Sequence, residues 1–174
     1  MNNTNQQYDT EYFNRHSDGL KLCIELIRCS SQLDRIIDRN LRSKFGQSIS
    51  RFDLLAQLQR VGESGLSIGE LGKRLISAKG NITGLINRMI KDELLLKTAK
   101  IGDRRSFNIK ASAKGSQLFK QMADSHAQWV YELFADIDLE SMNNMTYLLG
   151  DIRGALLNRE GNRESNTEAN KENR

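Results

Sequence analysis

Lysine and arginine are concentrated in one stretch of this 174-residue chain, residues 68–110. The stretch holds ten Lys and Arg residues and four Asp and Glu residues, so its formal charge is +6, although the whole chain carries only +4. The residues outside the stretch therefore sum to −2. A local excess of cations is what binding to a polyanion such as nucleic acid requires.

Residues that usually perform catalysis or hold metals are few and scattered. The chain has two histidines, His16 and His126, and two cysteines, Cys23 and Cys29, at no recognisable ligand spacing, so we expect neither a structural zinc site nor a cofactor. No glycine-rich phosphate loop is present and neither His lies in a catalytic motif. We therefore expect a protein that is not an enzyme.

The sequence also indicates the cellular compartment of the protein. No run of 18 apolar residues is present, and residues 1–15 lack the apolar segment of a signal peptide. Two cysteines six residues apart in one predicted helix lie about 240° apart around it, which excludes a disulfide within the helix. We expect a cytoplasmic protein in a reducing compartment, with no membrane partner.

The basic stretch begins with two short helical patterns. Ile68, Leu71 and Leu75 recur at helical spacing and predict a helix over residues 68–75, after which Ser77 is placed to cap a second helix. The second helix has one apolar face, formed by Ile82, Leu85, Ile86 and Met89, and its polar residues fall largely elsewhere. This order predicts a helix-turn-helix, whose second helix enters the major groove of DNA. Gly80 and Gly84 weaken that helix, a cost that close approach to a duplex explains.

Two extended runs follow the helical pair. Residues 94–98 and 106–110 are predicted to form a β-hairpin across a loop with the sequence Ala-Lys-Ile-Gly-Asp-Arg-Arg. Leu66 and Ser67 are predicted to add a short edge strand to it. A hairpin beside a helix-turn-helix is a winged helix.

The order of these elements, together with the segments GNITGLINRM, DRRS and IKASAKG, resembles the MarR family of bacterial transcription regulators. The family's Asp-x-Arg wing element is matched by Asp103 and Arg105, and its Ser/Thr-x-x-Gly helix start is matched by residues 112–115. The resemblance covers about residues 20–157. This chain departs from the family at Glu93, where a Gly is usual, and near residues 50–52, where no Pro opens the helix.

The resemblance implies a sequence-specific regulator that binds double-stranded DNA at a pseudo-palindromic operator and represses transcription. From the pattern and the resemblance we expect base contacts from Lys79, Asn81 and Thr83, a phosphate contact from Arg88, and insertion of Arg105 into the minor groove, with Asp103 holding its side chain. The full set of expected DNA-binding residues is Ser77, Lys79, Asn81, Thr83, Asn87, Arg88, Asp103, Arg104 and Arg105. A winged helix used only for protein contact is the alternative, but it does not need cations at both the second helix and the wing.

The segments around the basic stretch predict a mostly α fold with a small β-hairpin wing, a winged helix-turn-helix flanked by N- and C-terminal dimerisation helices. We expect a flexible N-terminus over 1–17, a dimerisation helix over 18–45 stopped by Gly46, the DNA-binding region over 46–111, and C-terminal dimerisation helices over 112–157 that begin at Ser112 and Asp138. These helices carry more apolar surface than a small winged helix covers, so a homodimer is expected rather than a monomeric bundle. Residues 158–174 repeat Asn-x-Glu-x and are interpreted as a disordered tail, either free or continuous with the last helix.

Regulation has two candidate mechanisms. The family commonly binds a small ligand, often an aromatic carboxylate or its thioester, and Arg28, Arg35 or Arg39 offer bidentate partners for a carboxylate. Alternatively, Cys23 resembles in position the peroxide-sensing Cys of the organic-hydroperoxide branch, although Phe52 stands where that branch uses Tyr. The sequence identifies neither the effector nor the operator, and does not distinguish a repressor from an activator.

Overall fold

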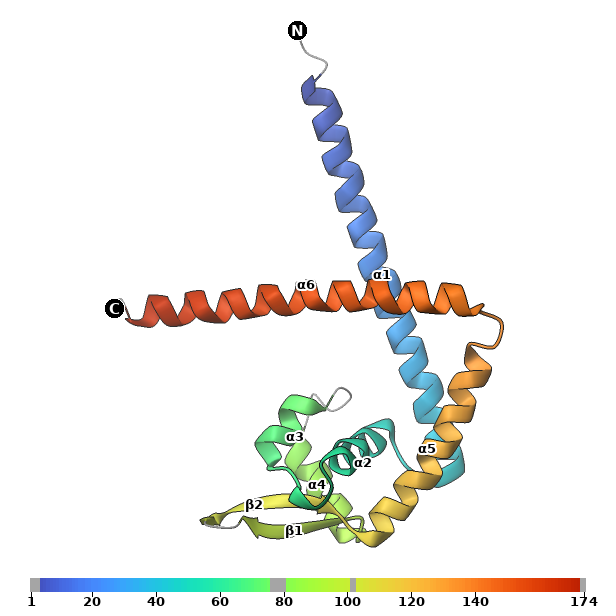
Figure 1. Ribbon diagram of the computed structural model, residues 1–174, viewed down its shortest axis with the longest axis vertical. Helices are drawn as coiled ribbons and strands as arrows, with labels where there is room; N and C mark the ends of the chain where they lie inside the picture. Colours follow the sequence, from blue (N-terminus) through green and yellow to red (C-terminus); the bar gives the residue numbers. More distant parts are fainter. Residues whose placement is uncertain (1–3, 76–80, 101–102, 173–174) are drawn as a thin grey trace. The chain divides into compact units, whose positions relative to one another are not determined.

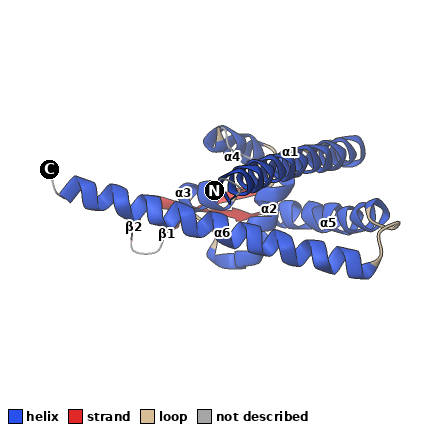
Figure 2. Cartoon of the chain, turned by 90° about the horizontal axis from the view of Figure 1, so that it is seen from above, coloured by secondary structure: helices blue, strands red, loops and turns tan. Residues whose placement is uncertain are grey.

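The computed structural model describes the backbone of residues 4–75, 81–100 and 103–172, and the side chains of residues 17–75, 81–99, 107–159 and 161. These residues form helices and one two-stranded antiparallel ribbon (Figures 1 and 2). The chain divides into two compact units, residues 1–127 and 128–174. None of the described helices is long and apolar enough to span a membrane.

The first unit opens with α1 (Thr4–Phe45) and α2 (Ile49–Val61). Gly46 ends α1 with a φ of +66°, as expected for a left-handed residue after a helix, and Ser48 caps α2 by accepting from the Arg51 amide. The start of α1 differs from the expected one near Asp18, because the helix already includes the segment assigned to a flexible N-terminus. Between Thr4 and Ser17 the sequence contains neither Pro nor Gly, so nothing in the backbone chemistry stops the helix there.

The winged helix follows as a 3₁₀ turn (Gly62–Ser64), α3 (Ile68–Arg74), α4 (Ile82–Lys91), β1 (Leu95–Lys100) and β2 (Asp103–Ala111). Leu66 pairs with Ile109 as the predicted edge strand, through amide-to-carbonyl bonds of 3.0 and 2.8 Å. A shared core unites these elements. Its fully buried members include Leu41, Leu54, Leu55, Leu58, Leu71, Ile86, Met89, Leu95, Ile109 and Met122.

Helix α5 (Ala113–Leu133) begins as expected at Ser112, whose hydroxyl accepts from the Gly115 amide at 2.9 Å. Gly115 is required there, because a Cβ at this position would lie 2.1 Å from the Leu94 carbonyl oxygen. The first turns of α5 are therefore packed directly against the chain that leaves α4.

The second unit is dominated by α6 (Leu139–Glu172). The predicted cap is confirmed, because the Asp138 carboxylate accepts from the Ser141 amide at 2.8 Å. That bond and the Ser141 hydroxyl lower the pKa of Asp138. The helix continues through the Asn/Glu-rich segment to Glu172, as in the alternative in which this segment is continuous with the last helix. The sequence explains this, since cations at Arg163 and Lys171 follow glutamates by three residues and offset the like charges.

Candidate nucleic-acid interface

The candidate interface is centred on α4, which is strongly amphipathic. Leu85, Ile86 and Met89 are buried in the core of the winged helix. The residues on the other faces are exposed, namely Asn81, Thr83, Asn87, Arg88 and Lys91. Four of the predicted DNA-binding residues, Asn81, Thr83, Asn87 and Arg88, are therefore brought together on or just before the solvent side of one helix.

The start of this helix differs from the prediction. Asn81, not Ser77, is the N-cap, because its side-chain oxygen accepts from the Gly84 amide at 2.8 Å and α4 begins at Ile82. Ser77 and Lys79 lie outside the described residues. A helix starting at Ser77 would have Gly80 as well as Gly84 in its interior, whereas Asn is among the best capping residues.

Gly84 has a local reason to be glycine. A Cβ at this position would lie 2.7 Å from the side-chain nitrogen of Asn81. Any larger residue must therefore push the capping amide aside. The absence of a side chain at Gly84 is explained by the cap, with no need to invoke a nearby duplex.

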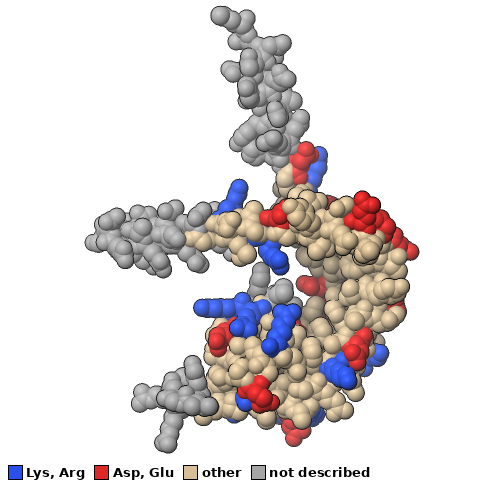
Figure 3. Space-filling model, in the orientation of Figure 1, with Lys and Arg blue, Asp and Glu red and all other residues tan. Residues whose placement is uncertain are grey.

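Helix α3 adds cations that the sequence reasoning did not single out. Lys73 and Arg74 occupy its exposed last turn, and Figure 3 shows Lys and Arg side chains gathered over this helix. The start of α3 is fixed by a capping box, in which Ser67 accepts from the Glu70 amide at 3.2 Å and Glu70 accepts from the Ser67 amide at 2.8 Å. Lys73 and Arg74 contribute to the positive charge of residues 68–110, but only the structure places them beside α4.

The wing is a longer hairpin than the predicted one. Lys100 pairs with Asp103, so only residues 101 and 102 separate the strands, and Asp103, Arg104 and Arg105 belong to β2 instead of a seven-residue loop. A shorter turn lets more backbone groups pair. The side chains of these three residues lie outside the described part of the chain, so their predicted roles stay predictions.

Several contacts fasten the wing to the body of the winged helix. The side chain of Asn108 donates to the Ser64 carbonyl at 2.9 Å, and Lys110 forms an ion pair of 3.1 Å with Glu63. On the wing surface, Lys97 lies 4.0 Å from the ring centroid of Phe107. This contact restricts the side-chain motion of Lys97, a cation for which the sequence alone indicates no partner.

The junction between α4 and the wing passes through Glu93, which has a φ of +63°. This left-handed backbone conformation is the one that glycine adopts most readily, and glycine is the residue usual at this position in the MarR family. The Glu93 carbonyl accepts from the Ser112 hydroxyl at 2.6 Å, and its carboxylate forms a 3.0 Å ion pair with Lys114. Interactions with α5 therefore help to hold a strained residue in place.

The residues predicted to sense an effector lie along α1, with exposed side chains. Arg28 forms an ion pair of 2.9 Å with Glu25, and the Arg35 side chain donates to the Ser31 carbonyl at 3.2 Å. Both line a depression that is open to solvent, while Arg39 is exposed near the end of the helix. Cys23 is exposed and has a free thiol.

An aromatic cluster joins α2 to α5. The Phe52 ring stacks on Phe119 with centroids 5.5 Å apart and contacts the His126 ring at 5.1 Å. Burial lowers the pKa of His126, because an imidazolium would lose hydration among these rings. This histidine therefore favours the neutral form in the folded chain.

Comparisons with known proteins agree with this geometry. The MarR family model matches residues 48–107, which include α2, α3, α4, β1 and much of β2. The chain is 28% identical to the HTH-type transcriptional regulator PecS of Dickeya dadantii over 134 residues, covering 76% of this chain and 80% of PecS.

Solved structures share the fold. A MarR family transcriptional regulator from Silicibacter pomeroyi superposes with a TM-score of 0.71 at 28% identity, covering 82% of this chain and 97% of that one. MepR from S. aureus in complex with DNA gives a TM-score of 0.67 at 16% identity over 76% of this chain and 96% of MepR.

Proposed function

Because this chain belongs to the MarR family of transcription regulators, whose members are not enzymes, we propose that it is a repressor that binds a pseudo-palindromic operator as a homodimer. The observation that carries the proposal is α4, whose buried face is apolar and whose exposed face is polar and basic. A repressor of this kind needs only to occupy its site and exclude polymerase.

In this proposal α4 enters the major groove, and some of its exposed residues contact bases while others contact phosphates. Asn81 and Thr83 lie at its N-terminal end, from which side chains reach base edges, and Arg88 lies one to two turns further on, where a phosphate contact is expected. Thr83→Ala should relax base preference by about 1–3 kcal/mol. Arg88→Ala should weaken binding to all sequences alike and lower the salt slope by about one.

Asn81 needs a more careful substitution, because it also caps α4. Asn81→Ser retains a capping oxygen but removes the amide group that can read a base. A readout role predicts lost discrimination with nearly unchanged thermal stability. Unchanged discrimination by Asn81→Ser would remove Asn81 from the set of base-reading residues.

The wing is proposed to contact the minor groove through Arg105, with Arg104 on a phosphate and Asp103 restraining Arg105. Arg105→Ala should cost more affinity than Lys97→Ala, and the difference should grow with the A/T content of the operator flanks. Asp103→Ala should weaken binding even though it removes a negative charge. Tighter binding by Asp103→Ala would mean that the wing contributes only bulk charge.

The proposed homodimer is supported by apolar side chains left exposed in each unit. Leu20, Ile24 and Ile27 are exposed along α1, and α6 exposes a larger set consisting of Leu139, Met145, Tyr147, Leu148, Leu149, Leu156 and Leu157. A second copy is the simplest cover for such surfaces. Deleting residues 142–174 should give a monomeric or aggregating protein, whereas deleting residues 167–174 should change nothing measurable; a dimeric, DNA-binding 142–174 deletion contradicts the interface.

Release of DNA is proposed to follow binding of a small aromatic carboxylate or its thioester near Arg28, Arg35 and Arg39. Such a ligand acts only to the extent that it binds the DNA-free conformation more tightly than the DNA-bound one. The exposed Cys23 supports a second candidate, in which a peroxide oxidises the thiolate. Titrating the protein–operator complex with a panel of aromatic acids and with cumene hydroperoxide, using wild type and Cys23→Ser, separates the two.

The function itself is tested by selecting duplexes from a random pool and comparing the enriched duplex with a scrambled one. Specific recognition predicts a clear preference for the enriched duplex, together with a steep loss of affinity as salt increases. A winged helix used for protein contact alone would enrich no sequence.

A further inference from the structure

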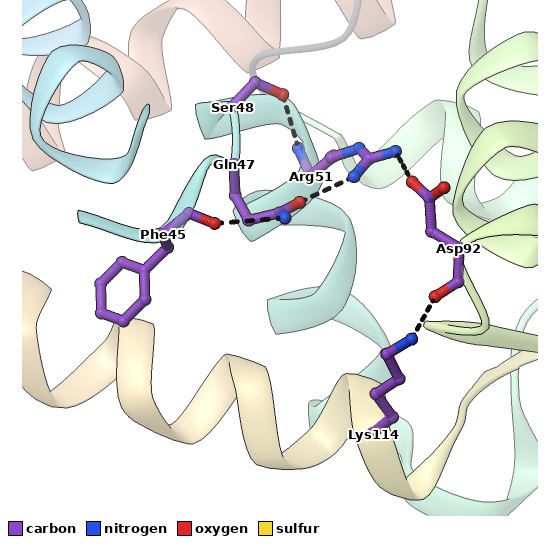
Figure 4. Close-up of polar contacts among 6 residues, drawn as sticks. All are labelled: Phe45, Gln47, Ser48, Arg51, Asp92 and Lys114. Carbon is purple, nitrogen blue, oxygen red and sulfur yellow. Dashed lines mark hydrogen bonds and ion pairs between the residues drawn. The ribbon is translucent and has the colours of Figure 1, made fainter. Parts of the chain in front are cut away.

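A chain of polar contacts meets the C-terminal end of α4, the proposed recognition helix, and connects four helices (Figure 4). The side-chain nitrogen of Gln47 donates to the carbonyl of Phe45, the last residue of α1, at 3.4 Å. Arg51 of α2 donates to the side-chain oxygen of Gln47 at 2.8 Å. The other terminal nitrogen of Arg51 forms an ion pair with the carboxylate of Asp92, which caps the C-terminal end of α4.

Asp92 is also the attachment point of α5. Its backbone carbonyl accepts from the side-chain nitrogen of Lys114 at 3.0 Å, and the same nitrogen lies 3.0 Å from the Glu93 carboxylate. Asp92 therefore contacts α2 through its side chain and α5 through its backbone. The end of α4 is held from two directions at one residue.

The junction at the far side of this chain of contacts is itself fixed. The Asp38 carboxylate of α1 accepts from the Ile49 amide of α2 at 2.9 Å and from Arg42 at 2.5 Å. Arg51 thus connects α4 to the junction between α1 and α2, which is held by the hydrogen bonds of Asp38 and is not a free surface loop.

Burial makes the loss of one partner more costly for the Arg51–Asp92 pair than for an ordinary surface pair. The Arg51 side chain is 17% exposed, the lowest value for a cation among the ion pairs of the described side chains, and Asp92 is 48% exposed. Losing one partner leaves a mostly buried guanidinium without its counter-charge, which costs more than losing an exposed pair.

The position of the pair matters because a small tilt at the C-terminal end of α4 displaces its N-terminal end, which carries the proposed base contacts. The ten residues of α4 span about 15 Å. If the C-terminal end were released and α4 tilted by about 4°, its N-terminal end at Asn81 and Thr83 would move by about 1 Å. Hydrogen bonds to base edges do not tolerate such a shift, whereas contacts between flexible cations and phosphates do.

We propose that Arg51 and Asp92 are positioning residues for sequence readout, which hold the recognition helix at the angle its base contacts need. The inference rests on the proposed function, since it assumes that α4 reads DNA. Arg51 acts through Asp92 and Asp92 acts through the orientation of α4, so neither needs to touch the duplex. Their loss should reduce discrimination between sequences more than affinity for DNA in general.

Asp92→Asn gives the sharpest test, because bulk electrostatics and the positioning role predict opposite changes in affinity for the enriched duplex. The substitution removes a negative charge beside a DNA-binding surface, so bulk electrostatics predicts equal or tighter binding to every duplex. The positioning role predicts about tenfold weaker binding to the enriched duplex, with binding to the scrambled duplex unchanged or slightly tighter. Fluorescence anisotropy at one fixed salt concentration measures both affinities on the full-length protein.

Four companion variants complete the design. Asp124→Asn removes the same charge from an exposed position on α5 and should leave the ratio of the two affinities unchanged. Arg51→Met should lower the ratio, and Arg51→Met with Asp92→Asn should lower it no further than Arg51→Met alone, because the two residues act as one link. Arg51→Lys keeps the charge and should recover part of the ratio.

The outcomes separate failure of the inference from failure of the proposed function. If wild type enriches no duplex, the proposed function is overturned and the inference with it. If an enriched duplex exists and Asp92→Asn binds it as tightly as wild type does, only the inference is overturned. Equal weakening on both duplexes with a large drop in melting temperature also overturns it, because the pair would then only stabilise the fold.

Discussion

The N-terminal cap of α4 gives a prediction that combines two substitutions. Asn81 accepts from the Gly84 amide at 2.8 Å, and a Cβ on Gly84 would lie 2.7 Å from the Asn81 side-chain nitrogen. The clash is with the end of a flexible side chain, so Gly84→Ala is accommodated by rotating the Asn81 amide away from its capping position. The methyl group and the cap therefore exclude each other.

The magnitudes follow from this exclusion. Asn81→Ala removes the cap and should lower the free energy of unfolding by about 1 kcal/mol. Gly84→Ala should raise helix stability by about 1 kcal/mol through lower backbone entropy, but it also displaces the cap, so the net change in the wild-type chain should be near zero. In the Asn81→Ala chain no cap remains to be lost, and Gly84→Ala should then stabilise by the full ~1 kcal/mol.

Urea unfolding of the four proteins at one fixed concentration, followed by circular dichroism, measures the cycle. The expected coupling is about 1 kcal/mol, well above the scatter between distant, independent sites. A Gly84→Ala protein that is more stable than wild type by the full ~1 kcal/mol would refute the reasoning, because the cap would then survive the methyl group or contribute nothing.

Four further substitutions, of which Gly150→Ala is a control, test other features of the fold. Glu93→Gly should raise the free energy of unfolding by about 1 kcal/mol in urea melts, because a φ of +63° strains any residue with a Cβ; a loss of stability would mean that the Lys114 ion pair outweighs the strain. Gly115→Ala should cost more than about 2 kcal/mol or prevent folding, because its methyl group meets a backbone carbonyl, while Gly150→Ala meets nothing within 4 Å and should be neutral or stabilising. For His126, burial lowers the pKa below its usual 6.5, so the unfolded chain binds more protons near that pH and stability should fall as pH drops from 7 through 6.5; His126→Phe should flatten this part of the profile.

Much of the fold was predictable because its signals are local. Gly46, Ser112 and Asp138 mark helix boundaries by chemistry that acts within one turn, and the structure places them as expected. The apolar spacing from Ile68 to Met89 likewise predicts the two helices of the helix-turn-helix. The sequence also predicts that Leu66 and Ser67 pair with the wing, since a short extended run before a hairpin has few other partners, and the structure identifies Ile109 as the residue paired with Leu66.

Errors arose where two local signals competed. Ser77 and Asn81 are both good caps, and only the geometry shows that Asn81 is used. The sequence predicts a loop for the basic residues before Phe107 because Gly102 favours a turn, yet backbone pairing extends to Lys100 and Asp103. Both errors shift the boundary of a helix or strand by a few residues, but the predicted order of helices and strands is unaffected.

Contacts between distant segments could not be predicted from one sequence. Arg51 and Asp92 are 41 residues apart, and nothing in their local sequence marks them as partners. The same is true of the aromatic contact between Phe52 and His126. Such pairs depend on how helices pack, which spacing along the chain does not encode.

Footprinting on the enriched duplex tests the central claim most directly, namely that two copies of α4 read successive major grooves about a two-fold axis. Hydroxyl-radical cleavage combined with methylation interference at guanine N7 reports which grooves are occupied. A two-fold dimer should give two symmetry-related major-groove contacts with centres about 10 bp apart and two chains bound per duplex. A single asymmetric half-site, or a footprint bound by one chain, would contradict it.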